Sequence, residues 1–87
     1  MKGRRVLITS AAAGISEVIV YRFAEAGADL ELADIDEIGL QRVKEVTTYF
    51  DVEVNTHVVD SSNRSEISKL WEGLNGREPD ILVNNAR

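Results

Sequence analysis

The sequence has 87 residues, of which 44% are hydrophobic and 29% are charged, and these values are typical of one small globular domain. A formal net charge of −5 argues against a general nucleic-acid-binding surface. The absence of cysteine excludes disulfides, thiolate catalysis and cysteine-based zinc sites, and no apolar run approaches the roughly 20 residues that a membrane-spanning helix needs. We expect a cytoplasmic protein that binds neither nucleic acid nor membrane.

The N-terminal third of the sequence predicts a strand, a turn and a helix. Residues 5–9 form a short β-branched run that is typical of a buried strand, although the basic start MKGRR followed by apolar and small residues also imitates a signal peptide. Residues 10–14 are a turn of small residues. Residues 15–26 predict a helix that ends at Gly27. Its apolar face is expected to consist of Ile15, Val18, Ile19 and Phe23.

The middle of the sequence repeats this alternation. Residues 29–34 (DLELAD) predict a second strand, and Asp36 is placed to cap a second helix. The C-terminal boundary of that helix is left open, because VTTYF is rich in β-branched and aromatic residues. The residues at helical spacing are Leu40, Val43, Val46 or Thr47, and Phe50. Residues 52–59 predict a third strand.

A third helix and a fourth strand complete the pattern. Asn63 and Glu66 have the spacing of a capping box at the start of the helix. The strongest helical spacing in the sequence is that of Ile67, Leu70, Trp71 and Leu74. Gly76 closes the helix, and residues 80–84 (DILVN) predict the fourth strand.

The order β-α-β-α-β-α-β predicts a single α/β domain over residues 1–87. Such alternation is typical of a parallel sheet with right-handed crossovers and helices on its faces. We expect a truncated Rossmann-like half with the strand order 3-2-1-4. Ligands of such sheets bind at the carboxyl ends of the strands, here strands 1 and 4.

The first strand-turn-helix unit has the chemistry of a phosphate-binding turn. A small-residue loop before a helix points backbone N–H groups and the positive end of the helix dipole at an anion. Gly14 allows close approach of a pyrophosphate. Asp34 follows about 20 residues later, at the end of the second strand, where an acid is expected to bind ribose hydroxyls. Such an acid repels a 2′-phosphate and therefore favours NAD over NADP.

Four motifs in register resemble the short-chain dehydrogenase/reductase family. The stretch TSAAAGIS (residues 9–16) is similar to that family's T-G-x-x-x-G-I-G turn, and DILVNNA (residues 80–86) is similar to its fourth strand with the N-N-A-G motif. Asp34 and Asp60 match the family's ribose- and adenine-contacting acids. In detail the chain is similar to the 3-oxoacyl-acyl-carrier-protein reductase branch. The resemblance implies weak NAD binding by Thr9, Ser10, Gly14, Ile15, Asp34, Ile35, Asp60, Ser61, Asn84 and Ala86.

Several residues depart from the family pattern. Ser10 and Ser16 replace the first and third glycines of the turn, and a positive φ at Ser10 would be strained because serine has a Cβ atom. Arg87 replaces the glycine of N-N-A-G. Glu31 lies inside a strand that should be buried, where an unpaired charge is costly. Together these departures suggest a relaxed demand on the cofactor site.

Each site residue also has a structural explanation. The turn at Gly14 and Ile15 can persist without a ligand, Asp34 can be a solvated carboxylate, and Asp60 can help to cap the following helix. The hydroxyl of Ser10 can donate to an oxyanion or belong to a neutral turn residue.

Other reactive side chains point to structure rather than to a site. His57 lacks an obvious metal partner and is expected to pack within its strand. Trp71 is expected in the core or in an interface. A helix start explains the acids Asp34, Asp36 and Glu37 better than a metal site does.

The resemblance also implies what this sequence lacks. The family's catalytic serine and Tyr-x-x-x-Lys follow N-N-A-G, and neither Tyr21 nor Tyr49 has a lysine four residues on. We therefore expect a truncated NAD-binding module without catalysis of its own. The alternatives are half of a reductase completed by a second chain, and a scaffold that has lost nucleotide binding. The uncovered edge of the fourth strand predicts a homodimer, formed through that edge or by exchanged elements.

Overall fold

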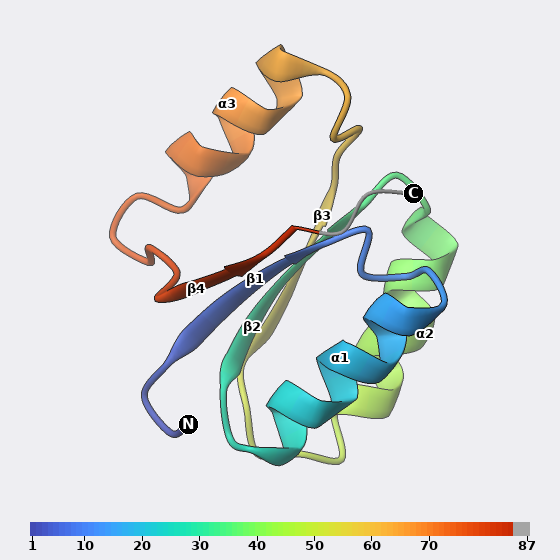
Figure 1. Cartoon of the computed structure of the whole chain (residues 1–87), viewed down its shortest axis with the longest axis vertical. Coiled ribbons are helices and arrows are strands. Elements are labelled where there is room, and N and C mark those ends of the chain that lie inside the picture. Colours follow the sequence, from blue (N-terminus) through green and yellow to red (C-terminus); the bar gives the residue numbers. More distant parts are fainter. Residues whose placement is uncertain (85–87) are drawn as a thin grey trace.

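The computed structural model of the chain describes residues 1–84 as a parallel sheet with helices on both faces (Figure 1). The strand order is β3-β2-β1-β4, as predicted. The strands are β1 (Arg5–Thr9), β2 (Asp29–Asp34), β3 (Val54–Val58) and β4 (Ile81–Val83). The helices are α1 (Ile15–Glu25), α2 (Glu37–Thr47) and α3 (Arg64–Gly73).

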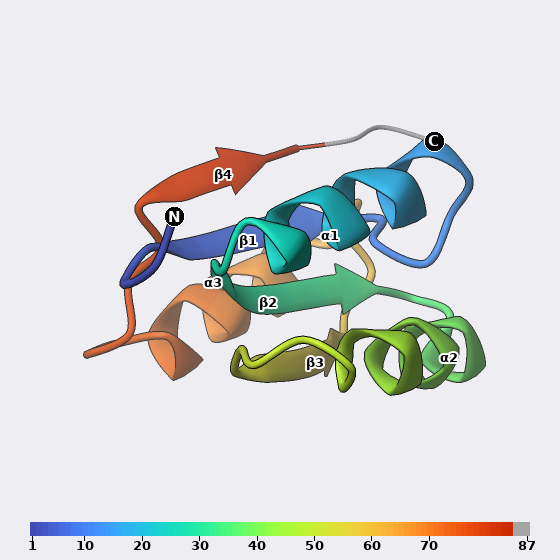
Figure 2. The same ribbon diagram turned by 90° about the horizontal axis from the view of Figure 1, so that it is seen from below.

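The layers follow from the right-handed crossovers between parallel strands. Helices α1 and α2 lie on one side of the sheet and α3 lies on the other (Figure 2). Strands β3 and β4 are shorter than predicted. Strand β4 is limited by its pairing, which runs only from Ile81 opposite Val6 to Val83 opposite Ile8. No helix within residues 1–84 is long and apolar enough to cross a lipid bilayer.

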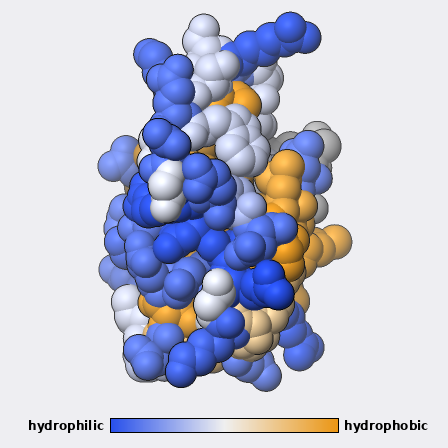
Figure 3. All heavy atoms as spheres, turned by 90° about the vertical axis from the view of Figure 1, so that its left-hand side faces the viewer, coloured by the Kyte–Doolittle hydropathy of each residue, from blue (hydrophilic) through white to orange (hydrophobic). Residues whose placement is uncertain are grey.

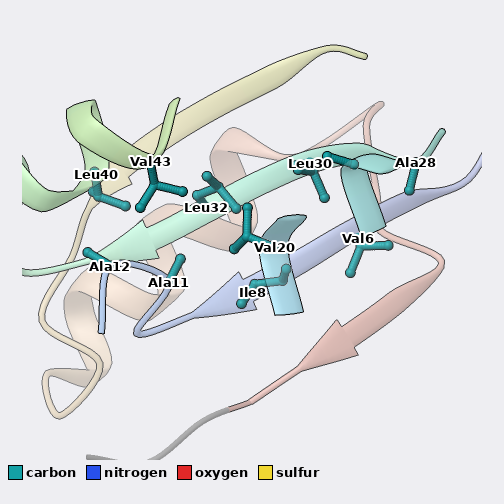
Figure 4. Packing of buried hydrophobic residues seen from close by; sticks show 11 residues of the cluster. Val6, Ile8, Ala11, Ala12, Val20, Ala28, Leu30, Leu32, Leu40 and Val43 are labelled. Atoms are coloured by element: carbon teal, nitrogen blue, oxygen red, sulfur yellow. The ribbon is translucent and has the colours of Figure 1, made fainter. Parts of the chain in front are cut away.

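The main core lies between the sheet and the helices α1 and α2 (Figure 4). It includes Val6 and Ile8 from β1, Leu30 and Leu32 from β2, and Leu40 and Val43 from α2. The apolar face predicted for α1 is partly wrong. Ile15 is 79% exposed and Val18 is 56% exposed, whereas α1 buries Ser16, Val20 and Ala24. Small side chains at two of these positions let the helix backbone lie close to the strands, and this contact decides which face is buried.

A smaller cluster attaches α3 to the opposite face of the sheet. Leu70 of α3 and Leu74, the residue that follows the helix, pack with Leu7 and Ala33 of the sheet and with Val59, and all five are buried. Trp71 lies beside this stripe but remains 43% exposed.

The α3 side of the sheet also contains an ionic network around Glu31, which is completely buried. The Glu31 carboxylate accepts hydrogen bonds from Arg5 at 2.7 Å and from Asn55 at 2.8 Å, and it lies 2.8 Å from His57 Nε2. Arg5 also pairs with Glu53 at 3.2 Å. The buried charge of Glu31, which would be costly if unpaired, therefore has partners on both neighbouring strands.

Candidate functional site

A crevice of about 480 Å³ opens at the carboxyl ends of the parallel strands. This is the end of a doubly wound sheet at which ligands bind, and the volume lies within the range of about 300–1,000 Å³ that is typical of ligand pockets. Seven of the predicted site residues line the crevice: Thr9, Ser10, Asp34, Ile35, Asp60, Ser61 and Asn84. Gly14 and Ile15 lie outside its lining, at the start of α1. Ala86 and Arg87 lie outside the described residues.

Four residues that line the crevice were missed by the sequence analysis: Ala33, Val59, Ser62 and Ile67. Ser62 and Ile67 belong to the segment that enters α3, and both contribute to the lining. Ile67 carries a helical-core signal in the sequence and also packs partly against the cluster below α3. The helical spacing of Ile67 predicts that it packs under α3, but nothing in the sequence predicts that it also lines the crevice.

The turn between β1 and α1 has two residues in the left-handed region. Ser10 has a φ of 52°, and Gly14 has a φ of 46° with a ψ of −116°. The strain expected for a serine at this position is therefore present, because a Cβ atom disfavours positive φ. At the start of the turn, the Thr9 hydroxyl donates to Asn84 Oδ1 at 3.0 Å. This bond ties the end of β1 to the residue that follows β4.

The N-terminus of α1 is not capped by any side chain of residues 1–84. Gly14 occupies the cap position. The N–H groups of Ser16 and Glu17 donate to the carbonyls of Ala13 and Gly14. Within residues 1–84, nothing accepts from the N–H groups of Gly14 and Ile15. Two donors at the positive end of the helix dipole are therefore available to an anion.

The other two helices are capped by their own side chains. Asp36 accepts from the N–H of Gly39 at 2.9 Å, which confirms its predicted role and explains the acids at this helix start. Asn63 Oδ1 accepts from the N–H groups of Ser65 at 3.0 Å and Glu66 at 3.3 Å, in the first turn of α3. The expected capping box is only half formed, because Glu66 accepts from the N–H of Asp60 instead. Within residues 1–84, no group of three or more potential metal ligands exists.

Asp34 is a buried anchor for the turn. It is 3% exposed, so it is not a solvated carboxylate. Its Oδ2 accepts from the N–H of Ala12 at 3.0 Å, and its Oδ1 accepts from the N–H of Asp36 at 3.0 Å. Asp34 also lines the crevice, so its carboxylate places acceptor oxygens at the crevice wall.

Asp60 shapes the loop that leads into α3. Its Oδ1 accepts from the N–H of Ser62 at 2.9 Å and from the Ser62 hydroxyl at 2.6 Å. The hydrogen bond from the Ser62 hydroxyl, and to a smaller extent the one from the Ser62 N–H, holds the pKa of the Asp60 carboxyl below its usual value. The ionised carboxylate is thereby fixed at the wall of the crevice.

The residues present fit the adenosine and pyrophosphate parts of a dinucleotide. The open helix N-terminus supplies donors for phosphate oxygens, and Asp34 supplies an acceptor for ribose hydroxyls. A parallel sheet of this strand order, with a crevice at the carboxyl ends of its strands, defines a Rossmann-like domain.

The chain belongs to the short chain dehydrogenase family, whose family model matches residues 4–87. Among curated relatives, it is 36% identical to 3beta-hydroxysteroid dehydrogenase 2 of Eggerthella lenta, covering 99% of this chain and 34% of that protein. It is 38% identical to human estradiol 17-beta-dehydrogenase 11, covering 97% of this chain and 29% of that protein. The chain thus spans about a third of the length of these relatives.

Solved structures of the family show the same fold. A metagenomic short-chain oxidoreductase in complex with NADP superposes with a TM-score of 0.91 at 28% identity, over 99% of this chain and 40% of that chain. The 3-ketoacyl-(acyl-carrier-protein) reductase from Brucella melitensis, complexed with NADH, gives a TM-score of 0.85 at 33% identity, over 98% of this chain and 34% of that chain. Both cofactors occur among these neighbours. The similar proteins include hydroxysteroid dehydrogenases as well as this reductase, so the expected branch is not singled out.

Proposed function

We propose that this chain is the nucleotide-binding part of a short-chain dehydrogenase and that it binds NAD(H) in the crevice. The observation that carries the proposal is the uncapped N-terminus of α1, with the N–H groups of Gly14 and Ile15 unbonded within residues 1–84. Helices α2 and α3 of the same chain satisfy this need with their own side chains. An anion at α1 supplies what those caps supply elsewhere.

Each part of the nucleotide has a matching group. Gly14 and Ile15 donate to the pyrophosphate, Asp34 accepts from the ribose hydroxyls, and Asp60 faces the adenine. The buried carboxylate of Asp34 also disfavours a 2′-phosphate, because two negative charges would meet where little solvent screens them. We therefore propose that NAD is preferred over NADP.

We propose a dehydrogenase or reductase activity only for a protein in which this chain is joined by the residues that transfer protons. The bound nicotinamide would supply hydride transfer, and this chain's residues would bind and orient the nucleotide. The two tyrosines, Tyr21 and Tyr49, are followed four residues on by Glu25 and Glu53, so neither forms a Tyr-x-x-x-Lys motif. The proton-transfer groups must come from another segment.

The edge of the sheet supports an association with a partner. Strand β4 lies at the end of the strand order, and Leu82 on it is 50% exposed. Apolar atoms also gather along one side of the molecule (orange in Figure 3). We propose that β4 pairs with a second copy, directly or by exchanged elements, or with a chain that completes the enzyme. Sedimentation of a well-folded monomer at high micromolar concentration contradicts the homodimer.

A scaffold that no longer binds nucleotide is the competing proposal. The departures from the family pattern favour it, because Ser10, Ser16 and Arg87 stand where that pattern has glycine. The cytoplasmic location expected from the sequence stays a prediction.

Asp34→Asn tests the proposed function. It removes the charge and nearly keeps the shape, but one of the two oxygens that accept from Ala12 and Asp36 becomes a donor, so only a variant shown to be folded is informative. The wild-type chain is expected to bind NAD saturably in a calorimetric titration and to bind NADP more weakly. In Asp34→Asn the preference for NAD over NADP should shrink by about tenfold, because the carboxylate charge no longer opposes the 2′-phosphate. Circular dichroism of both proteins controls for folding. No heat up to millimolar NAD from folded wild-type chain would establish the scaffold instead.

A further inference from the structure

The hydroxyl of Ser10 is a buried polar group with no hydrogen-bond partner in the described part of the chain. Ser10 is 8% exposed and lines the crevice. Within residues 1–84, no group donates to its hydroxyl or accepts from it. The hydroxyl of the preceding residue, Thr9, is by contrast bonded to Asn84. A buried hydroxyl is normally satisfied by protein or by ordered water. Because Ser10 lines the crevice, a molecule bound there can supply that partner.

The backbone of Ser10 adds a second, independent observation. Its φ of 52° makes it the one residue other than glycine with a positive φ in residues 1–84. Glycine would adopt this conformation without strain, and it would fit the turn as well. A serine that keeps both the strain and an unbonded hydroxyl at a ligand crevice is the pattern expected when the side chain serves a ligand.

We propose that the Ser10 hydroxyl donates a hydrogen bond to a phosphate oxygen of the bound nucleotide. This inference rests on the proposed nucleotide function and adds to it a side-chain phosphate ligand. Ser10 opens the turn that leads to Gly14 and Ile15, whose free N–H groups lie at the positive end of α1. A neutral donor there supports the same anion as those amides, whereas the ribose hydroxyls are served by the Asp34 carboxylate.

Three variants separate the hydroxyl from the backbone. Ser10→Ala removes the hydroxyl and keeps the Cβ atom and the strained φ. Ser10→Gly removes the hydroxyl and relieves the strain. Ser16→Ala is the matched control, because Ser16 is also buried, at 4% exposed, and its hydroxyl has no partner within residues 1–84, yet it does not line the crevice.

The experiment is a chemical-shift titration of each folded variant with ADP and with adenosine, which lacks the phosphates. Ser10→Ala and Ser10→Gly should each weaken ADP binding about tenfold, as expected for a lost hydrogen bond to a charged group, and leave adenosine binding unchanged. Ser16→Ala should bind both ligands like the wild type. In urea, the unfolding midpoint of Ser10→Gly should rise while its ADP affinity falls, and a purely structural residue would move both in the same direction.

Three outcomes overturn the inference. If Ser10→Ala binds ADP as tightly as the wild type, the hydroxyl does not bond the phosphate, and the proposed nucleotide binding still stands. An equal loss for adenosine and ADP moves the contact away from the phosphate. A folded wild-type chain that binds neither NAD nor ADP overturns the proposed function together with this inference.

Discussion

Replacing Glu31 by glutamine should severely weaken the domain, although the side chain keeps nearly the same shape. Glu31 is completely buried and bonds Arg5, Asn55 and His57 from the two neighbouring strands. Glutamine offers one acceptor oxygen where the carboxylate offered two, and its amide donors would face donors on the partners. The Arg5 guanidinium would also lose its buried counter-charge, while its exposed partner Glu53 would remain.

The magnitude follows from the burial of the pair. Removing one partner of a buried ion pair costs about 3–5 kcal/mol, and we expect about 3 kcal/mol because Arg5 keeps its second partner. A domain with ~0.1 kcal/mol of stability per residue has about 9 kcal/mol at this length. The substitution would thus remove about a third of the free energy of unfolding.

Urea denaturation followed by circular dichroism measures this loss. With a slope of about 1 kcal/mol per molar urea, the midpoint of Glu31→Gln should fall by about 3 M. Glu53→Gln is the matched control, because Glu53 belongs to the same network but its side chain is 50% exposed, and its midpoint should change little. If the two variants shift the midpoint equally, the buried network does not hold the strands together.

Two further substitutions test other contacts. Burial and the hydrogen bond to Glu17 raise the pKa of Tyr21 to about 12, so the stability that depends on its neutral phenol is complete below pH ~10 and is lost as the pH rises towards 12. The urea midpoint should fall between pH 9 and pH 11 by more in the wild type than in Tyr21→Phe, and an equal fall contradicts the assignment. Gly39→Ala would place a methyl group 2.5 Å from Asp36 Oδ2, so it should disrupt the α2 cap and cost about 1 kcal/mol of stability, measured by thermal unfolding. Gly73→Ala is the control, because its methyl group meets no atom within 4 Å and should not destabilise the domain.

The topology was predictable because its signals are local. Alternating strand and helix patterns define a parallel sheet without any knowledge of distant contacts, and the strand order followed from them. The side-chain caps Asp36 and Asn63 were also predictable, since a cap bonds groups only two or three residues away. The position of the crevice follows from the same rule, because parallel strands end at one edge.

What the sequence could not supply depends on distant partners. The partners of Glu31 lie on β1 and β3, 24 to 26 residues away, so its pairing is invisible to any local pattern. The same limit applies to Asp34, whose bond to the N–H of Ala12 spans 22 residues. For α1, the apolar pattern named Ile15 and Val18, but close backbone approach to the sheet selected another face.

The central place of β1 has a consequence for synthesis on the ribosome. Strand β1 lies between β2 and β4, and its Arg5 N–H donates to Asp80, 75 residues further along the chain. At ~5–20 residues per second, translation takes ~4–15 s to bridge that interval. During this time one edge of β1 has no neighbour, and Leu7 and Ile8, which the finished fold buries, lack part of their cover. Such long-range pairing also slows folding. We therefore expect the nascent chain to expose a surface that chaperones can bind until β4 pairs with β1, and this pairing also brings Asn84 to the crevice.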